Sequence, residues 1–213
     1  MGQSSEKLVL IGGGGHCKSV MDTLIRCGQY SDIVVTDCEK RAGDTILGYA
    51  VAGTDDILPY LYSDGIENAF ITVGSIKSTE LRRHIYHQVR EIGFSFPGIV
   101  DTSAIVSESA KLGKGVFIGK NASVNAEVMI GDFAIINTGA VIEHECQIGD
   151  FTHIAVGATV CGGAIIDNDV FVGANATVIQ QVRIGRNSII GAGSIVLADV
   201  PENTTVVGIW GGI

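Results

Sequence analysis

The second half of the chain repeats one hydrophobic position every six residues. From Leu112 to Val196 each sixth residue is Leu, Ile or Val, and the residue four places after each is small. An α-helix would drift out of phase with this period within two turns, and an alternating strand would need turns long before the pattern ends. A parallel β-helix accommodates both features, because each six-residue unit supplies one short strand and one corner. The period therefore predicts a solenoid with the aliphatic residues inside.

The start of this repeat contains one irregularity. Ile99 and Ile105 keep the six-residue spacing, but Leu112 follows Ile105 by seven residues. We therefore expect a slip or a small bulge near Lys111. Glycine, Asn or Asp often comes directly after the aliphatic residue, as at Gly113, which favours a sharp backbone corner at that place.

The first half of the chain alternates aliphatic and amphipathic segments. Residues 7–11 read as a short aliphatic strand, 12–15 are a glycine run, and 18–26 carry apolar residues at helical spacing. Strand, glycine loop and helix in this order form a phosphate-binding arrangement, because the loop and the helix start present free backbone amides.

Two further strands and a helix continue this alternation. The strands are predicted at 33–36, ending before Asp37, and at 69–73, ending before Gly74, and the helix at 79–92. Such alternation indicates a parallel sheet with crossover helices, whose ligands bind at the carboxyl ends of the strands. We therefore predict two domains, a small Rossmann-like α/β domain over residues 1–97 and a parallel β-helix over residues 98–213.

The glycine loop does not match the dinucleotide fingerprint. Cys17 stands where the third glycine of G-x-G-x-x-G belongs. A single nucleotide diphosphate suits a tight glycine turn with free amides, and a domain of this size is too small for the two halves of a dinucleotide fold. Two alternatives remain open: the turn could serve only the packing of strand on helix, and His16 could bind a phosphate or cap the turn.

Composition and charge narrow the class of protein. The chain is 46% hydrophobic and 17% charged, as in ordinary soluble proteins. A net charge of −9 argues against nucleic acid or an anionic membrane surface as partner, since both need a basic footprint. The first aliphatic run is too short for a membrane span or a leader, so we expect a cytoplasmic protein. The five cysteines include no C-x-x-C pair, which indicates reduced thiols.

His144 stands between Glu143 and Glu145 in the repeat. It comes two places after Ile142, off the interior positions, so it can face outward into a cleft. An imidazole can accept a proton near neutral pH, and a neighbouring carboxylate orients it, although a solvated surface histidine would fit the same pattern. Cys146 occupies the small corner position and reads as a core residue rather than a nucleophile.

Five motifs together resemble one family. They are Gly12-Gly-Gly-Gly-His16, Asp37, Gly74, Ile136-Asn-Thr-Gly-Ala-Val-Ile-Glu-His-Glu145 and Phe151-Thr-His-Ile-Ala-Val-Gly157. Their order resembles the nucleotide-sugar N-acetyltransferases of the bacillosamine and perosamine type, hexapeptide-repeat acyltransferases to whose wider family the sialic acid O-acetyltransferases belong. The resemblance implies a left-handed, triangular coil of three units per turn, hence about five coils.

The resemblance also implies roles for individual residues. His144 would be the general base, Glu145 would raise its basicity, and Asn137 would orient the sugar. Acetyl-CoA, the co-substrate, would contact His153, Gly162, Ala174 and Ala192. The sugar nucleotide would be bound by Gly14, Gly15, His16, Asp37 and Gly74. No metal is expected.

Two positions depart from the family pattern. Cys38 stands where a second acid often follows Asp37, and the usual Gly-x-Pro-Ala-Lys ending is replaced by Gly208-Ile-Trp-Gly-Gly-Ile213. The first bears on the preference for a nucleotide, and the second, which contains Trp210, bears on the far end of the CoA site.

The sequence thus predicts acetylation of a nucleotide-linked amino sugar, a UDP- or GDP-linked 4-amino-deoxy sugar, for surface glycan synthesis. Because a triangular prism exposes flat faces and His144 has no pocket within one chain, we expect a homotrimer with active sites between subunits. Three alternatives stay open. They are O-acetylation of sialic acid or a related sugar, a β-helical carbonic anhydrase, which needs three zinc-binding histidines where this coil has only His144 and His153, and a non-catalytic nucleotide-sugar-binding protein.

Overall fold

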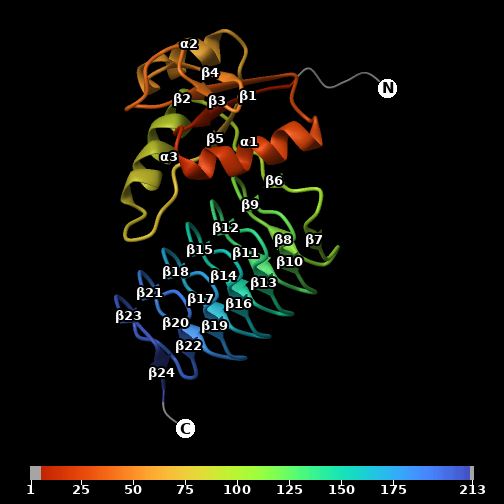
Figure 1. Cartoon of the computed structure of the whole chain (residues 1–213), viewed down its shortest axis with the longest axis vertical. Coiled ribbons are helices and arrows are strands. Elements are labelled where there is room, and N and C mark those ends of the chain that lie inside the picture. Colours follow the sequence, from red (N-terminus) through yellow and green to blue (C-terminus); the bar gives the residue numbers. More distant parts are fainter. Residues whose placement is uncertain (1–5, 212–213) are drawn as a thin grey trace. The chain divides into compact units, whose positions relative to one another are not determined.

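A computed structural model describes residues 6–211 of the chain (Figure 1). Backbone contacts divide these residues into two compact units. The first unit contains residues 6–74 and 80–97, and the second contains residues 75–79 and 98–211. The short segment Ser75–Thr79 therefore groups with the second unit, although the chain continues into the first unit at both of its ends.

The first unit is an α/β domain around one sheet, with the strand order β3 (Thr45–Ile46), β4 (Tyr49–Gly53), β2 (Asp32–Thr36), β1 (Lys7–Ile11) and β5 (Asn68–Ile71). The central strand β1 pairs in parallel with β2 and with β5. Residues 8–11 of β1 are fully buried, as expected for a parallel strand covered on both faces. The elements that the sequence analysis predicted are β1 (Lys7–Ile11), α1 (Gly15–Cys27), β2 (Asp32–Thr36), β5 (Asn68–Ile71) and α3 (Glu80–Ile92).

The sequence pattern predicted no element over residues 45–63, where the structure has four. They are β3 (Thr45–Ile46), β4 (Tyr49–Gly53), the 3-10 helix η1 (Asp55–Ile57) and α2 (Leu58–Ser63). β3 and β4 form an antiparallel hairpin whose two turn residues, Leu47 and Gly48, have φ of 49° and 89°. These elements are too short for hydrophobic periodicity to reveal, and an exposed leucine in a left-handed turn gives no sequence signal.

The second unit is a parallel β-helix of two-residue strands arranged in three faces. Neighbouring strands of a face pair in parallel, and most partners lie 18 residues apart, as Val141 and Thr159 do. Face I contains β6 (Ile99–Val100), β9 (Phe117–Ile118), β12 (Ile135–Ile136), β15 (His153–Ile154), β18 (Phe171–Val172), β21 (Ile189–Ile190) and β23 (Thr205–Val206). Face II contains β7 (Ile105–Val106), β10 (Ser123–Val124), β13 (Val141–Ile142), β16 (Thr159–Val160), β19 (Thr177–Val178), β22 (Ile195–Val196) and β24 (Ile209–Trp210). Face III contains β8 (Lys111–Leu112), β11 (Met129–Ile130), β14 (Gln147–Ile148), β17 (Ile165–Ile166) and β20 (Arg183–Ile184).

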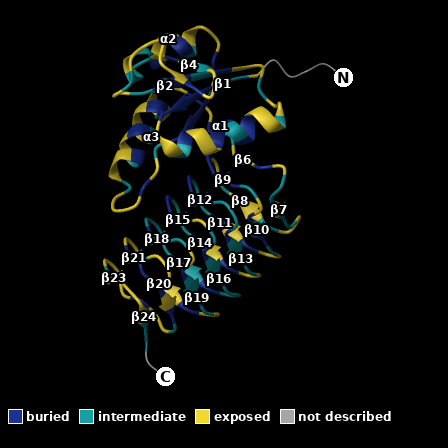
Figure 2. Ribbon diagram, in the orientation of Figure 1, coloured by how far each residue is buried: buried dark blue, intermediate teal, exposed yellow. Residues whose placement is uncertain are grey.

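The residues that repeat every six positions fill the interior of this coil. The aliphatic positions from Ile118 to Val196 are buried, and so are the small residues four places after each (Figure 2). Leu112 is 38% exposed, because its strand β8 is the first strand of face III. The coil also extends at both ends beyond the fifteen predicted units, from β6 to β24, so the estimate of five coils was too low.

The expected slip near Lys111 is wrong. Val106, not Ile105, occupies the interior register, because Val106 pairs with Val124 and packs against the core while Ile105 is 70% exposed. Val100 likewise pairs with Ile118. The period therefore runs without interruption through Leu112. At each of these two places, two neighbouring residues are aliphatic (Ile99 and Val100, Ile105 and Val106). Residue type alone therefore could not show which of the two points inward.

The corner also lies elsewhere than predicted. Positive φ occurs three residues after the interior residue, as at Asn121 and Glu127, and not directly after it. The glycine directly after the interior residue is needed because the next coil is close. A Cβ on Gly131 would lie 2.7 Å from the backbone nitrogen of Asp150, and one on Gly149 would lie 2.5 Å from that of Asn168.

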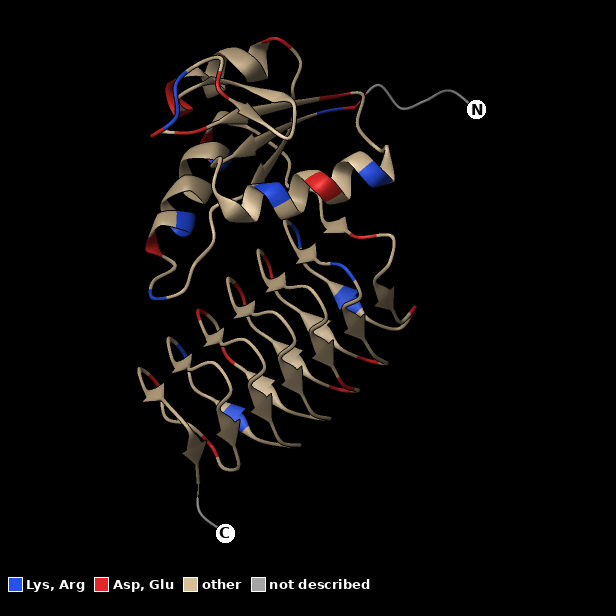
Figure 3. Ribbon diagram, in the orientation of Figure 1, with Lys and Arg blue, Asp and Glu red and all other residues tan. Residues whose placement is uncertain are grey.

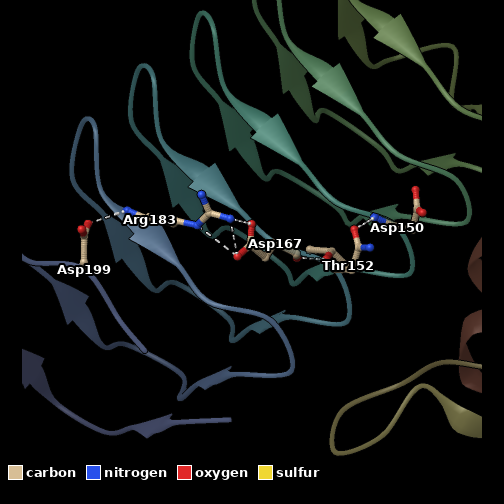
Figure 4. A network of polar contacts seen from close by, with 6 residues as sticks. Asp150, Thr152, Asp167, Arg183 and Asp199 are labelled. Atoms are coloured by element: carbon tan, nitrogen blue, oxygen red, sulfur yellow. Dashed lines mark hydrogen bonds and ion pairs between the residues drawn. The ribbon is translucent and has the colours of Figure 1, made fainter. Parts of the chain in front are cut away.

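Charged side chains of the coil lie in its turns and connect successive coils. Among the described coil strands only Lys111 and Arg183 carry a charge (Figure 3). The Arg183 guanidinium donates to the Asp167 carboxylate at 2.8 Å, and the Arg183 backbone amide donates to the Asp199 carboxylate at 2.8 Å (Figure 4). Such bonds satisfy backbone amides that face the next coil.

Across residues 6–211, none of the helices has the length and apolar character needed to cross a membrane.

Candidate active site

His144 and Glu145 lie in the corner between faces II and III, after β13. The His144 Nδ1 atom is 3.0 Å from the Glu145 carboxylate oxygen Oε2, and the side chains are 60% and 64% exposed. Glu145 has φ of 60°, the left-handed conformation that the coil uses at this place in most of its corners. The corner therefore turns the carboxylate back towards the imidazole of the preceding residue.

Gly162 lies beside the His144 ring in the next coil. It occupies the same corner position 18 residues later, and the Gly163 amide donates to the His144 carbonyl at 2.9 Å. A Cβ on Gly162 would lie 2.6 Å from both Cε1 and Nε2 of His144. The absence of a side chain at position 162 therefore makes the space that the imidazole occupies.

This arrangement leaves one ring nitrogen available for chemistry. A carboxylate accepts hydrogen bonds, so the proton of a neutral His144 ring lies on Nδ1, towards Glu145. Nε2 then carries the lone pair.

Asn137 and His153 form a second group, at face I and the corner between faces I and II. The Asn137 amide nitrogen is 3.3 Å from His153 Nε2, and His153 Nδ1 is 2.9 Å from the Ser75 carbonyl oxygen. The His153 side chain is 9% exposed and meets the Phe171 ring edge to face at 5.2 Å. Ala174 and Ala192 occupy the same corner as Asn137, in later coils, after β18 and β21.

The structure therefore separates the predicted coil residues into two groups. His144, Glu145 and Gly162 lie at one edge of face II, and Asn137, Ala174 and Ala192 lie at its other edge. His153 belongs to the second group, on face I. Within one chain the strands of face II separate the two groups.

The predicted nucleotide residues meet at the carboxyl ends of β1, β2 and β5. The Gly13 amide donates to the Asp37 carboxylate at 2.5 Å, and a Cβ on Gly74 would lie 3.8 Å from that of His16. Cβ atoms built on Gly14 and Gly15 would meet no atom of residues 6–211 within 4 Å. Gly14 is the N-cap of α1 and has no side-chain cap, so the loop backbone faces open space.

Asp37 organises this loop. Its carboxylate accepts backbone amides of Gly13, Glu39 and Lys40. Burial raises the pKa of Asp37, but these three amides and the Lys40 ammonium outweigh burial, and the pKa lies below its ordinary value. Asp37 is therefore an anion that shapes the glycine loop, a role that its place after β2 did not reveal.

Cys146 lies in the coil core, as its small corner position predicts, whereas Cys38 is exposed. Burial raises the pKa of Cys146 to about 11, so the thiolate needed for nucleophilic attack is disfavoured.

Trp210 pairs through β24 with β22 and packs against the core, and its indole NH donates to the Asp199 carbonyl at 3.0 Å. The last two residues of the atypical ending, 212–213, lie outside the described residues.

His144 and His153, the two histidines that a zinc site in this coil would use, belong to the two separate groups. Within residues 6–211, no three His, Cys, Asp or Glu side chains come together in an arrangement suited to a metal ion.

Two further contacts of the site were not predicted from the sequence. One is the contact of Gly162 with His144, which the 18-residue spacing could have revealed, because three repeats return the chain to the same corner. The other is the Ser75 carbonyl on His153, for which the sequence carries no signal, since a backbone atom of an irregular segment makes the contact.

Two family models match the chain. The PglD N-terminal domain matches residues 7–89, and the bacterial transferase hexapeptide matches residues 109–144 and 163–198. No match was found among curated proteins.

Solved structures match almost the whole chain. A variant of GDP-perosamine N-acetyltransferase from Caulobacter crescentus, in complex with CoA and GDP-perosamine, is 35% identical, with a TM-score of 0.89 over 98% of this chain and 96% of that one. The acetyltransferase domain of PglB from Neisseria gonorrhoeae is 32% identical, with a TM-score of 0.89 over 95% and 97%. The same domain in complex with acetyl coenzyme A is 28% identical, with a TM-score of 0.75 over 96% and 97%. The predicted fold class, an α/β domain followed by a left-handed parallel β-helix, is confirmed.

Proposed function

Because the chain belongs to the acetyl-CoA-dependent nucleotide-sugar N-acetyltransferases of the bacillosamine and perosamine type, we propose that it acetylates the amino group of a UDP- or GDP-linked 4-amino-deoxy sugar, for surface glycan synthesis. The observation that carries this proposal is the His144–Glu145 pair beside Gly162, which presents a proton acceptor on the coil. The matched complexes with CoA, GDP-perosamine and acetyl coenzyme A support the choice of both substrates.

The chemistry needs one base and no covalent enzyme intermediate. The amine attacks the thioester carbonyl of acetyl-CoA, a C–N bond forms, and the C–S bond breaks as the CoA thiolate leaves. The amine loses a proton in the same sequence, and His144 Nε2 accepts it while Glu145 holds the imidazolium. Proton transfer from the imidazolium to the thiolate releases CoA as its thiol and restores the neutral ring. The free thiol is therefore the assay signal.

The glycine loop supports binding of the nucleotide diphosphate. Its backbone faces open space at Gly14 and Gly15, at the start of α1, where amides and the helix dipole favour an anion. Because the chain has a net charge of −9, its overall charge does not attract a diphosphate. Backbone amides of the loop can bind the phosphates instead. We assign phosphate recognition to this loop and the neighbouring positions His16 and Gly74.

Gly14→Val is expected to raise KM for the sugar nucleotide at least tenfold and to leave KM for acetyl-CoA within about twofold. A Cβ at Gly14 would have no described atom within 4 Å apart from its chain neighbours, so folding should change little, but the added side chain fills the space that we assign to the phosphates. Steady-state kinetics with each substrate varied in turn measure the effect. Gly14→Ala is the matched control, with a smaller rise. Equal increases in both KM values would refute the placement.

We propose that the active enzyme is a homotrimer with sites shared between chains. The base at the corner of faces II and III and Asn137 at the corner of faces I and II lie on opposite edges of face II. Adjacent chains can bring two such edges together, which a single coil cannot do. The exposure of His144 agrees with a pocket completed by a neighbour.

The assembly can be tested in two ways. Sedimentation at micromolar concentration should give three times the 22.3 kDa mass of one chain. Mixing denatured and refolded His144→Ala and Asn137→Ala chains, each of low activity, should restore part of the wild-type activity, because some sites then combine an intact residue from each chain. A fully active monomer, or no restoration in mixtures shown to contain both chains, would rule out shared sites.

A further inference from the structure

One peptide group of the glycine loop is held at both of its polar atoms. The Thr72 hydroxyl donates to the Gly12 carbonyl at 2.5 Å. The Gly13 amide of the same peptide donates to the Asp37 carboxylate at 2.5 Å. Thr72 directly follows β5 and Asp37 directly follows β2, the two strands that pair with β1. Because a peptide group is planar, bonds to its oxygen and to its N–H fix the orientation of the whole group.

The single hydrogen of the Thr72 hydroxyl points to Gly12. The hydroxyl oxygen also lies 2.9 Å from the Ile11 carbonyl oxygen, but that carbonyl already accepts the Thr72 backbone amide at 2.9 Å. The Gly12 carbonyl is therefore the nearer and the less occupied of the two acceptors. A hydroxyl has one hydrogen and two lone pairs, so the Thr72 oxygen remains able to accept a hydrogen bond.

Cys17, in the first turn of α1, supplies a donor to that oxygen. Its thiol is hydrogen-bonded to the Thr72 side chain, and burial raises the pKa of Cys17 to about 11. The thiol therefore keeps its hydrogen at neutral pH and donates it. Cys17 is 0% exposed and Thr72 is 1% exposed, so water does not compete for these bonds. A chain of hydrogen bonds thus runs from the Cys17 thiol through the Thr72 hydroxyl to the Gly12 carbonyl.

The held peptide determines where the remaining amides of the loop point. The Gly12 amide donates to the Thr36 carbonyl at 2.8 Å, and the Gly13 amide is already engaged. The next two amides, those of Gly14 and Gly15, lie at the start of α1, where N–H groups have no acceptor within the helix. Glycine has the widest choice of backbone conformations, so these residues do not fix their own orientation. Their orientation therefore depends on the peptide that precedes them.

We propose that Thr72 and Cys17 are positioning residues for the diphosphate of the sugar nucleotide. Acting through the Gly12 carbonyl, they hold the loop so that the amides of Gly14 and Gly15 face the phosphates. The inference rests on the proposed function, in which this loop binds the nucleotide. Both side chains are buried, so they act through the backbone and not by contact with the ligand. A turn that served only packing would lose stability without its hydroxyl partner, with no selective loss of nucleotide affinity.

Three variants separate the members of this chain of hydrogen bonds. Thr72→Val replaces the hydroxyl by a methyl group of similar size and removes its bonds to Gly12 and Cys17. Thr72→Ser retains the hydroxyl and should restore the wild-type behaviour. Cys17→Ala removes the thiol but leaves the bond from Thr72 to Gly12. Thr23→Val, the same change at another fully buried position, in α1, is the matched control.

Kinetics distinguish positioning of the loop from a purely structural role. Thr72→Val should raise KM for the sugar nucleotide about tenfold, the order expected for one lost hydrogen bond, and Cys17→Ala about two- to threefold. KM for the sugar nucleotide in Thr72→Ser, and KM for acetyl-CoA in every variant, should stay within about twofold of the wild type. Thr23→Val should lower the melting temperature, as Thr72→Val does, without changing either KM. An unchanged KM for the sugar nucleotide in Thr72→Val, or an equal rise in both KM values, would overturn the proposal.

Calorimetry with UDP and GDP on the substrate-free full-length chain tests the inference without acetyl transfer. Thr72→Val should bind the nucleotide that the wild type binds about tenfold more weakly, and Thr72→Ser should restore the affinity. Equal affinity of Thr72→Val and the wild type, or no binding of either nucleotide to the folded wild type, would refute the inference. If nucleotide binding depends on Thr72 but the wild type acetylates no amino sugar, the inference holds and the proposed function fails.

Discussion

His144→Ala is expected to lower kcat by about 10²- to 10⁴-fold, the range for loss of a general base, while KM for acetyl-CoA stays nearly unchanged. The imidazole lies on the outside of the coil, 60% exposed, and contributes nothing to the core, so the variant should fold normally. Its Nε2 is the proton acceptor of the proposed mechanism, because Glu145 occupies Nδ1. Free thiol release under saturating substrates measures kcat, and the melting temperature checks folding.

Three comparisons test this result further. Glu145→Gln should lower kcat less, since it removes the carboxylate but leaves the imidazole in place. Raising the pH should restore part of the rate in both variants, because a larger share of the acceptor amine is then unprotonated. His84→Ala, at an exposed position of α3, should match the wild type. Near-normal kcat in His144→Ala at neutral pH would mean that the base lies elsewhere.

Gly162→Ala is expected to lower kcat by about 10- to 100-fold without lowering the melting temperature. The new Cβ would lie 2.6 Å from Nε2 and Cε1 of His144, so the imidazole must move. The ring is an exposed side chain and can move at little cost in stability, but a displacement of about 1 Å at a reacting group can cost 10²-fold in rate. Steady-state kinetics and thermal unfolding of the same preparation measure both effects.

The matched control for this variant is Gly98→Ala. A Cβ at Gly98 would have the Val116 carbonyl oxygen as its nearest neighbour, at 3.7 Å, which is ordinary contact. It should therefore change neither kcat nor stability. If Gly162 acted mainly by contact with acetyl-CoA, Gly162→Ala would raise KM for acetyl-CoA and leave kcat unchanged, and the steric account of the imidazole would be wrong.

The sequence predicted the coil well because its geometry is periodic. An aliphatic residue every sixth place can be satisfied by few structures, so the interior from Ile118 to Val196 followed from spacing alone. At the start of the repeat the same rule failed. Ile105 and Val106 are both aliphatic, and only strand pairing shows that Val106 points inward.

The candidate site was predicted in part. The neighbours His144 and Glu145 were visible in the sequence, because adjacent residues in a corner can reach each other. The crowding of His144 against Gly162 depends on coil stacking, and the bond of His153 to Ser75 depends on an irregular segment 78 residues away in the chain. Asp37 was placed at the right strand end, but its hydrogen bonds to three amides of the glycine loop needed coordinates.

Acetyl transfer to an amino sugar is the central claim, and one assay tests it most directly. The purified chain is incubated with acetyl-CoA and one sugar nucleotide at a time, chosen from UDP-, GDP- and dTDP-linked 4-amino sugars. Free thiol is followed over time, and the mass of the sugar product is determined by mass spectrometry. We predict thiol release in step with one acetyl group added to the amine of at least one UDP- or GDP-linked sugar, lost in His144→Ala. Folded protein that releases no thiol with any amino sugar, or that acetylates a hydroxyl group instead, would contradict the account.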